Sequence, residues 1–284
     1  IICSTESHSS VKAVAKVIGV KTSAADSGES GAIDYAAAKD AYDSALAEGL
    51  TPFAIVGTAG TTNFGIVDDL DGLAKLASEK GLWFHIDGAY GLAGILVPEL
   101  KQLYSGIENA DSLIVDPHKW LFAPFDACAL IYRQPALAKA VFSQHGEYLE
   151  PVNKNKDEWN PSDFAINLTR RARGLPLWFS LATHGIGTYR EAIRDNVNLA
   201  HKIAQEIRAR DYLQLVRDPQ LSVVVFERIG WEQKEYDAWS ERLLAEQIAL
   251  VLPSSLRGRP HTRFAIVNPM TTFELLVEIL DTMK

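Results

Sequence analysis

The chain has 284 residues, 47% hydrophobic and 9% aromatic, which is enough to bury the core of one large domain or two smaller ones. Its 36 acidic residues outnumber its 28 basic residues, for a net charge of −8, so no excess of Lys and Arg is available to bind nucleic acid through its phosphates. No apolar run approaches the length of a bilayer-spanning helix, which argues against a membrane partner.

The start of the chain and its cysteines bear on its location. Residues Ile1 to Thr5 lack the basic start and the cleavage pattern of a secretory signal. They are typical of the end of a buried strand, and because no initiator Met precedes them we expect that the chain begins inside a domain. Two cysteines, Cys3 and Cys128, are too few for a disulfide framework, so we expect a reducing cytoplasm.

Strand-like apolar runs alternate with amphipathic helical stretches in the first half of the chain. A helical stripe of Leu and Ala runs from Asp69 to Lys80 and stops at Gly81. This alternation predicts parallel βαβ units and an α/β fold with helices on both faces of the sheet. The predicted strands are Phe53–Val56, Leu82–Asp87, Ser112–Asp116 and Ala129–Tyr132.

The second half begins with a polar stretch from Gln144 to Asp163, and a loop of this length is usually functional or disordered. We predict a long helix over Gly187–Ala209 and then a smaller α+β unit. The domains are therefore expected to be residues 1–190 and 191–284. The smaller unit is predicted to contain strands near Leu213–Val216, Val223–Phe226, Ala249–Leu252 and Phe264–Val267, and helices at Glu235–Glu246 and Thr272–Met283.

Two of the predicted strands end on a carboxylate, at Asp87 and Asp116. Functional groups in parallel sheets collect at the carboxyl ends of the strands, where the loops form a crevice. The alternative for an isolated Asp is a turn residue or a helix cap. The role of these two residues therefore has to be inferred from the residues around them.

A lysine, Lys119, directly follows a predicted buried strand and an Asp-Pro-His turn in the segment SLIVDPHKW. Burying an ammonium group is costly, and desolvation lowers the pKa of a lysine and makes its amine a nucleophile towards carbonyl groups. This is the chemistry of a Schiff base. The alternative is a lysine in a surface loop, and the segment alone does not decide between the two.

The segment HIDGAYG, from His85 to Gly91, contains a second candidate. A carboxylate such as Asp87 can keep a pyridine nitrogen protonated, and Ala89 with the flanking glycines leaves room for a flat ring. His85 shares a strand face with Asp87, which raises the question of a metal ion. No zinc-type spacing completes such a site, so we expect no metal.

Two further segments are weaker indications. His8, within SHSS, can stack on a ring, or it can be an ordinary structural histidine. The serines that follow it can cap a helix that begins near Val11. The loop Gly57–Thr62 carries paired hydroxyl groups at a predicted strand end, and such a loop by itself indicates little.

In this order, the segments with His8, Thr62, Asp87 and Lys119 resemble those of the group II pyridoxal-phosphate-dependent amino acid decarboxylases. That family includes the aromatic amino acid, histidine and glutamate decarboxylases. The resemblance runs through nearly the whole chain, and the spacing onward to Tyr148 is most similar to the aromatic branch. It implies the fold of fold-type I pyridoxal-phosphate enzymes, with a large, mostly parallel sheet domain and a small C-terminal α+β domain.

The resemblance also implies pyridoxal 5'-phosphate as the cofactor, held as a Schiff base on Lys119. It makes Asp87 the partner of the pyridine nitrogen and places Ala89 beneath the ring. His8 corresponds to the histidine that stacks on the ring. Thr62 corresponds to a residue near the ring hydroxyl and the substrate.

The phosphate and the mobile loop have counterparts too. Asp116 and His118 occupy positions that help to hold the phosphate. Tyr148 matches the mobile-loop tyrosine that protonates the substrate carbanion, and relatives with Phe at this position tend towards aldehyde formation. The segment Leu168–Trp178 resembles the Arg-rich strip that follows the loop in the family.

Three features depart from the family pattern. Asp116 stands where Asn is more usual, and a carboxylate near a phosphate repels it unless it is screened. Thr169 stands where close relatives carry Gly or Ser, in the region that bears on substrate size. The N-terminal part of the family, with its Gly/Ser-rich phosphate loop, has no counterpart here, so we expect that the domain of residues 1–190 is incomplete.

The function implied by the resemblance is decarboxylation of an L-amino acid, aromatic by its spacing, to the amine and CO2. Family members are homodimers with the active site between the subunits, and we expect the same here. An acidic substrate such as glutamate stays open. The alternatives are another pyridoxal-phosphate reaction, namely aldehyde synthesis, phosphate-ester lyase chemistry or transamination, and a catalytically silent partner subunit or regulatory fragment.

Overall fold

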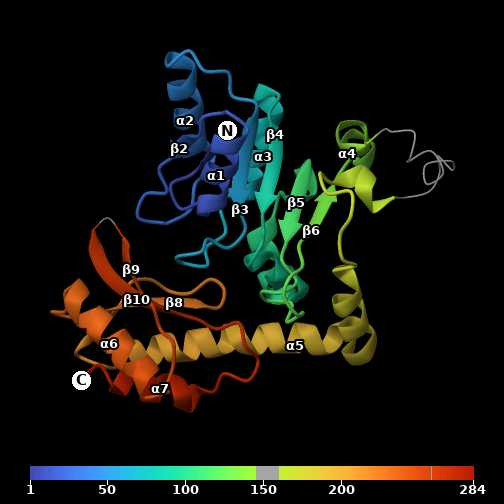
Figure 1. Ribbon diagram of the computed structural model, residues 1–284. Helices are drawn as coiled ribbons and strands as arrows, with labels where there is room; N and C mark the ends of the chain where they lie inside the picture. The colour runs from blue at the N-terminus through green and yellow to red at the C-terminus, as the bar shows by residue number, and fades with distance from the viewer. Residues whose placement is uncertain (145–159, 257) are drawn as a thin grey trace.

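The computed structural model describes residues 1–144, 160–256 and 258–284. They form two β-sheets that are linked by the long helix α5 (Gly174–Arg208), whose longer segment runs horizontally across the lower part of Figure 1. The larger sheet belongs to the first half of the chain and the smaller sheet to the C-terminal part. The predicted fold, a mostly parallel α/β unit with a smaller α+β unit, is confirmed.

The larger sheet has six strands in the order β2-β1-β3-β4-β5-β6. The first five strands in this order pair in parallel. Every residue of the central strand Ala54–Thr58 is buried, as is typical of a parallel sheet covered on both faces. The strands are β1 (Ile2–Ser4), β2 (Ser23–Ala25), β3 (Ala54–Thr58), β4 (Trp83–Asp87), β5 (Ser112–Val115) and β6 (Ala129–Tyr132).

Strand β6 differs from the prediction of parallel βαβ units, because it pairs with β5 in the antiparallel direction, with Leu130 opposite Ile114. A parallel pairing needs a crossover connection, usually a helix, that carries the chain back to its starting edge. The segment between Val115 and Ala129 consists of turns and irregular chain without such a helix. The chain therefore returns along β5 in the opposite direction.

Helix α3 (Leu70–Lys80) shows why the predicted helices form. The Asp69 side chain accepts a hydrogen bond from the Gly72 N–H at its start, and Gly81 ends it in the left-handed region at φ 65°. Its apolar stripe, with Leu73 fully buried, packs into the main core. The other helices of this unit are α1 (Ser9–Val17), α2 (Tyr35–Ala47) and α4 (Pro135–Phe142).

The smaller sheet is antiparallel, in the order β7-β8-β10-β9. The predicted strand Ala249–Leu252 is wrong: Val251 is buried, but the Ser240 hydroxyl donates a hydrogen bond to its carbonyl, and the strand begins two residues later at Pro253. The elements of this unit are β7 (Leu213–Leu215), β8 (Val223–Arg228), α6 (Gln233–Ala245), β9 (Pro253–Leu256), β10 (Arg259–Ala265) and α7 (Phe273–Asp281).

Helix α5 begins earlier than the predicted Gly187, because it includes a first segment from Gly174. The two segments meet at Gly185, whose backbone (φ 75°, ψ 153°) is non-helical and suits glycine alone. The domain boundary near residue 190 falls inside this helix and stays a prediction. Among the described residues, no helix combines the length and the apolar character that crossing a bilayer needs.

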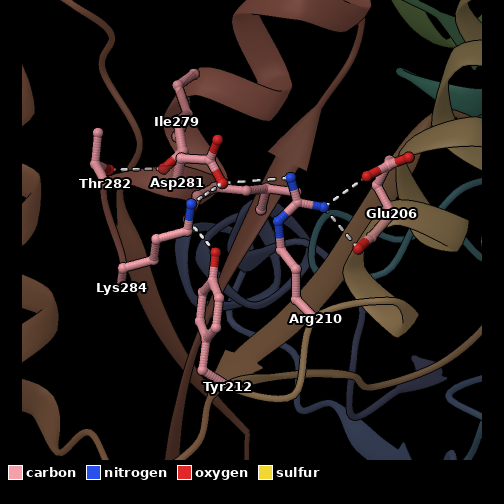
Figure 2. A network of polar contacts seen from close by, with 8 residues as sticks. Glu206, Arg210, Tyr212, Ile279, Asp281, Thr282 and Lys284 are labelled. Atoms are coloured by element: carbon pink, nitrogen blue, oxygen red, sulfur yellow. Dashed lines mark hydrogen bonds and ion pairs between the residues drawn. The ribbon is translucent and has the colours of Figure 1, made fainter.

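Polar contacts attach the C-terminal helix to the end of α5, as Figure 2 shows. Arg210 donates to the Glu206 carboxylate (2.7 Å) and lies 3.4 Å from the Asp281 carboxylate. Lys284 lies 3.1 Å from the same Asp281 oxygen. One carboxylate thus joins two cations from segments that are distant in sequence, and α7 is held against the long helix.

Candidate active site

Four neighbouring parallel strands, β1, β3, β4 and β5, end at the same edge of the larger sheet. The residues singled out from the sequence lie at or just beyond these ends. His8 follows β1, Thr62 follows β3, Asp87 is the last residue of β4, and Lys119 follows β5. The sheet topology therefore brings four segments, separated by long stretches of sequence, to one edge.

Backbone hydrogen bonds continue this edge beyond the strands. The Ala59 N–H donates to the Asp87 carbonyl (2.8 Å), which ties the loop after β3 to the end of β4. The Asp116 N–H donates to the Ala89 carbonyl (3.0 Å), which ties the turn after β5 to the turn after β4. The positions of Asp87 and of the turn that carries Lys119 are thus fixed relative to each other by the main chain.

Asp87 is a buried carboxylate, 9% exposed, whose Oδ1 accepts a hydrogen bond from the Ala89 N–H (3.1 Å). It lines a groove of about 700 Å³ that lies over one face of the sheet between α1 and α4. Most of the lining is apolar, including Trp83 and Ile114. Such surroundings strengthen the electrostatic interaction of this carboxylate with any cation that reaches it.

His85 lines the same groove, as its shared strand face with Asp87 predicted. Its Nδ1 lies 2.8 Å from the Ser112 hydroxyl, to which the Trp83 indole N–H also donates (2.9 Å). Desolvation lowers the pKa of His85, and the charge of Asp87 only partly opposes this. Among the described residues, no group of three or more His, Cys, Asp and Glu side chains is arranged to hold a metal ion.

The sequence left open whether Lys119 is buried, and the structure shows that it is not: its side chain is 40% exposed. Its Nζ lies 2.9 Å from Oδ2 of Asp116, whose own side chain is 14% exposed. The turn between the two residues is closed by a hydrogen bond from the Lys119 N–H to the Asp116 carbonyl (2.9 Å). The acidic residue at a position where Asn is more usual therefore serves as the counter-ion of the lysine.

Cys128, which directly precedes β6, was missed by the sequence analysis because a lone cysteine forms no motif. Desolvation raises the pKa of its thiol to about 12, assisted by a hydrogen bond to Asp116 and by the charges of Asp116 and Asp87, while Lys119 opposes the shift. Asp116 is thus the ionisable neighbour that affects this thiol most, and the charges of Lys119 and Asp87 have smaller effects.

His118 holds the loop that leads to β6. Its Nδ1 lies 2.6 Å from the Ala127 carbonyl oxygen and 3.0 Å from the Ala127 N, and its ring packs at a steep angle against Phe125, with the ring centroids 5.0 Å apart. Its Nε2 lies 4.0 Å from the Asp116 carboxylate. The part that Asp116 and His118 take in holding a phosphate stays a prediction.

His8 caps helix α1 with its own side chain: Nδ1 accepts from the Ser10 N–H (3.2 Å). The expectation that the following serines cap the helix is wrong, because the cap position falls one residue earlier. The imidazole is exposed beyond the end of β1, as is Thr62 beyond the end of β3. Thr61, in contrast, is fully buried and its hydroxyl accepts from the Ile66 N–H (3.2 Å).

The glycines beside Ala89 have a different role from the predicted one of leaving room for a ring. A Cβ on Gly88 would lie 2.5 Å from the Leu92 Cβ and 2.9 Å from the Ile114 carbonyl, and a Cβ on Gly91 would overlap the Ala59 carbonyl. Protein atoms fill these spaces. The glycines are therefore needed so that the turn after β4 packs against β5 and against the loop after β3.

The remaining site residues predicted from the sequence are Tyr148 and the Arg-rich strip. Tyr148 lies outside the described residues. In the Arg-rich strip, Arg171 and Arg173 both pair with Asp126, at 2.5 and 3.1 Å, and the hydrogen bond from Arg173 is the main cause that lowers the pKa of that carboxyl. Thr169 is exposed. The strip thus fixes the loop that follows the Lys119 turn.

These side chains fit a flat heteroaromatic aldehyde with a basic ring nitrogen. Lys119 offers an amine for the carbonyl group, and Asp87 offers a desolvated carboxylate for a protonated ring nitrogen. The groove of about 700 Å³ is lined by Asp87 but not by Lys119, so it adjoins only the carboxylate of this pair. Lys119 and Asp87 thus supply the two groups that such a molecule needs, one for a covalent bond and one for an electrostatic interaction.

Comparison with known proteins gives consistent matches. Residues 1–229 match the family model described as the pyridoxal-dependent decarboxylase conserved domain. The aromatic-L-amino-acid decarboxylase of Bacillus atrophaeus is 32% identical, over 99% of this chain and 61% of that protein. The 4-hydroxyphenylacetaldehyde synthase of Rhodiola rosea is 30% identical, over 80% of this chain and 46% of that protein.

The fold matches as well. The crystal structure of TDC from Oryza sativa with PLP and tryptamine superposes with a TM-score of 0.92 at 24% identity, covering 99% of this chain and 62% of that one. At this identity the likeness shows the fold alone. The chain spans about three fifths of the length of the Bacillus relative and of the rice protein.

Proposed function

Because this chain belongs to the family of pyridoxal-dependent decarboxylases, we propose that it carries the catalytic lysine of an enzyme that converts an L-amino acid to its amine and CO2. The observation that carries the proposal is that Asp87 and the Lys119–Asp116 pair follow neighbouring strands at the same carboxyl edge of the sheet, in turns that are joined by the Asp116-to-Ala89 backbone hydrogen bond. This edge supplies an amine and a desolvated carboxylate in the family's order. Pyridoxal phosphate is the cofactor that this pair of groups would hold.

In this proposal each side chain has a defined task. When bound, pyridoxal phosphate supplies an electron sink for the bond that breaks as CO2 leaves. Lys119 would bind the cofactor covalently through Nζ, and Asp116 Oδ2, 2.9 Å away, holds Nζ in position beforehand. Asp87 stabilises a proton on the ring nitrogen by a charge that is in place before the reaction.

Further residues are assigned by the resemblance. Ala89 and His8 would lie on either side of the ring, and Thr62 near its hydroxyl group. Asp116 and His118 would lie near the phosphate. Tyr148 would donate a proton to the α-carbon of the substrate once CO2 has left.

We propose an aromatic L-amino acid as the substrate, because the similar proteins include aromatic-L-amino-acid decarboxylases from Bacillus atrophaeus and from animals. Aldehyde synthesis is the second candidate, because the Rhodiola synthase is nearly as similar in sequence. The tyrosine at position 148 favours decarboxylation. The two reactions are distinguished by their products, amine in one case and aldehyde in the other.

The proposed assembly is a homodimer with the active site at the subunit interface, in a reducing cytoplasm. Large apolar side chains on the first segment of α5 support a partner surface, since Leu175, Trp178 and Phe179 are 52%, 60% and 60% exposed. Both cysteines are free, which agrees with a reducing compartment. Sedimentation of the full-length protein tests the dimer.

The decisive experiment traps the cofactor on the lysine. The full-length protein is mixed with pyridoxal phosphate, reduced with borohydride and digested, and the modified peptide is identified by mass spectrometry. The expected adduct is on Lys119, and Lys119→Ala should abolish both the adduct and CO2 release. Lys139→Ala is the matched control, because Lys139 has the same exposure (39%) and also pairs with a carboxylate, Asp163. Unmodified Lys119, or full turnover without it, contradicts the proposal.

A panel of amino acids then identifies the reaction. CO2 release from aromatic L-amino acids, with the amine as product, is the expected result. Release from glutamate alone would replace the aromatic substrate by an acidic one. Aldehyde without amine would replace decarboxylation by aldehyde synthesis.

A further inference from the structure

An aromatic pair, with Trp120 fully buried and Tyr90 partly buried, directly follows two turns of the candidate active site. The rings of Tyr90 and Trp120 stack at a centroid distance of 5.1 Å and an interplanar angle of 23°. Tyr90 directly follows Ala89, and Trp120 directly follows Lys119. The residue after Ala89 and the residue after Lys119 thus pack against each other through their rings.

Trp120 is the largest fully buried side chain among the described residues. Its indole N–H donates to Oδ1 of Asn196 on helix α5 (3.0 Å), and the Asn196 amide donates to the Asn268 carbonyl (3.3 Å), just beyond β10. A ring that is buried and also hydrogen-bonded has one orientation available to it. The backbone of Lys119, one residue earlier, is therefore fixed from the helix below.

Tyr90 is fixed from the smaller sheet. Its hydroxyl lies 2.6 Å from the Ser222 hydroxyl and accepts a hydrogen bond from the Ser222 N–H (3.1 Å). Ser222 is fully buried and directly precedes β8. The turn that carries Ala89 is therefore attached to the C-terminal unit through one phenol group.

We propose that Tyr90 and Trp120 are positioning residues, which set the placement of Lys119 relative to Asp87 and transmit to it the placement of α5 and the smaller sheet. The backbone bond from Asp116 to Ala89 joins the same two turns on their main-chain side, so the ring stack and this bond together close a rigid frame. The inference rests on the proposed function, because it concerns how the site holds its cofactor. It assigns Tyr90 and Trp120 a role that acts through the neighbouring residues Ala89 and Lys119.

The test compares two substitutions of Trp120 with the substitution of another buried tryptophan, far from the candidate site in the sequence. Trp120→Leu removes the stack, whereas Trp120→Phe keeps an aromatic ring there and removes only the indole N–H. Trp239→Leu is the control, because Trp239 is equally a buried indole (3% exposed) with one hydrogen bond, to Thr282, in the core of the smaller unit. Far-UV circular dichroism identifies a temperature at which all the proteins are folded.

Two readouts are independent of turnover: the dissociation constant of pyridoxal phosphate, and the visible circular dichroism of the bound cofactor, which reports a fixed orientation of its ring. Trp120→Leu should weaken binding about tenfold or more and reduce the dichroism, because small displacements of a covalent anchor are costly. Trp120→Phe should restore most of both, and Trp239→Leu should change neither by more than about twofold.

The smaller-sheet anchor is tested by Tyr90→Phe, which keeps the stack and removes the phenol group. Tyr236→Phe is its control, since the Tyr236 hydroxyl accepts from the Arg228 N–H (2.7 Å) in the core of the smaller unit. Tyr90→Phe should reduce the cofactor dichroism, and Tyr236→Phe should leave it unchanged.

Each outcome has one meaning. Wild-type protein that forms no adduct on Lys119 overturns the proposed function and this inference with it. If the wild type forms the adduct, two results overturn the positioning role alone. One is that Trp120→Leu binds pyridoxal phosphate as tightly as the wild type. The other is that Trp239→Leu binds it as weakly as Trp120→Leu.

Discussion

Lys119 Nζ lies 2.9 Å from Asp116 Oδ2, and the thiol of Cys128 interacts with the same carboxylate. One acidic residue, just beyond a parallel strand, thus pairs with a cation and also acts on a neighbouring thiol. Its charge holds the ammonium in place and at the same time disfavours a thiolate beside it. The reactivity of the cysteine therefore reports the state of Asp116 without any need for cofactor or substrate.

Asp116→Asn should make Cys128 more reactive. The hydrogen bond and the charge of Asp116 both raise the pKa of this thiol, so their loss lowers it towards its ordinary value. The rate of alkylation by iodoacetamide at pH 9 should rise roughly threefold to tenfold, since the thiolate is the reactive form. Asp43→Asn is the control, because Asp43 pairs with Lys39 on the exposed face of α2. An unchanged rate at Cys128 would mean that Asp116 does not face the thiol.

Arg263→Gln should weaken substrate binding more than it slows turnover. Arg263 on β10 donates to Asn63 (2.8 Å), whose amide donates to Glu6 (2.9 Å), so it connects the loop after β3 with the loop after β1. Loss of this connection loosens the segments that carry Thr62 and His8. We expect KM to rise about threefold to tenfold with a smaller change in kcat.

The control for that substitution lies on the same strand. Arg259→Gln removes an arginine that is 71% exposed and pairs with Glu227 at 2.9 Å, away from both loops. Steady-state kinetics with the best substrate of the panel measures both variants. Equal KM values for the two would show that the Arg263 contacts have no part in substrate binding.

Asp68→Asn should change the pH dependence of stability. Asp68 is 2% exposed and accepts from the Ile33 N–H (2.8 Å) and the Thr58 N–H (2.7 Å), yet desolvation raises its pKa from 3.8 to about 7. An acid whose pKa is higher in the folded state binds more protons there. Its stabilising contribution is complete below pH 3.8 and is lost as the pH rises through about 7.

Because other groups titrate too, the useful quantity is the difference in free energy of unfolding between wild type and Asp68→Asn. Between pH 5 and pH 8 the wild type should lose about 2 kcal/mol of unfolding free energy relative to Asp68→Asn, because asparagine does not titrate. Urea unfolding at several pH values measures it. A difference that is constant, or that moves in favour of the wild type at high pH, contradicts the raised pKa of Asp68.

Tyr148→Phe should shift the products from amine towards aldehyde, by about an order of magnitude in their ratio, because the substrate carbanion then lacks its proton donor. This prediction rests on the resemblance, since Tyr148 lies outside the described residues. Chromatography of amine and aldehyde gives the ratio. Tyr42→Phe, in α2, is the control. The same product ratio in all three proteins would remove Tyr148 from the mechanism.

Local patterns in the sequence determined those helices and strands in which apolar and polar positions differ clearly. The stripe from Leu70 to Leu76, between Asp69 and Gly81, defines α3, and the apolar runs before Gly57 and Asp87 define β3 and β4. Helix α2 gave no such signal, because its buried positions are alanines, Ala38, Ala41 and Ala45, and contrast little with their neighbours. Strand β2 is too short to show a period.

The sequence by itself singled out the residues that we propose to carry the chemistry, because Lys119, Asp87, Thr62 and His8 stand at or shortly after predicted strand ends. Only the tertiary structure decided how they are held. The antiparallel return of β6 brings Cys128 to Asp116, and the stacking of Tyr90 on Trp120 joins two turns that lie far apart in the chain. Such contacts depend on strand order and on side-chain packing between distant segments, and no local pattern of residues encodes either.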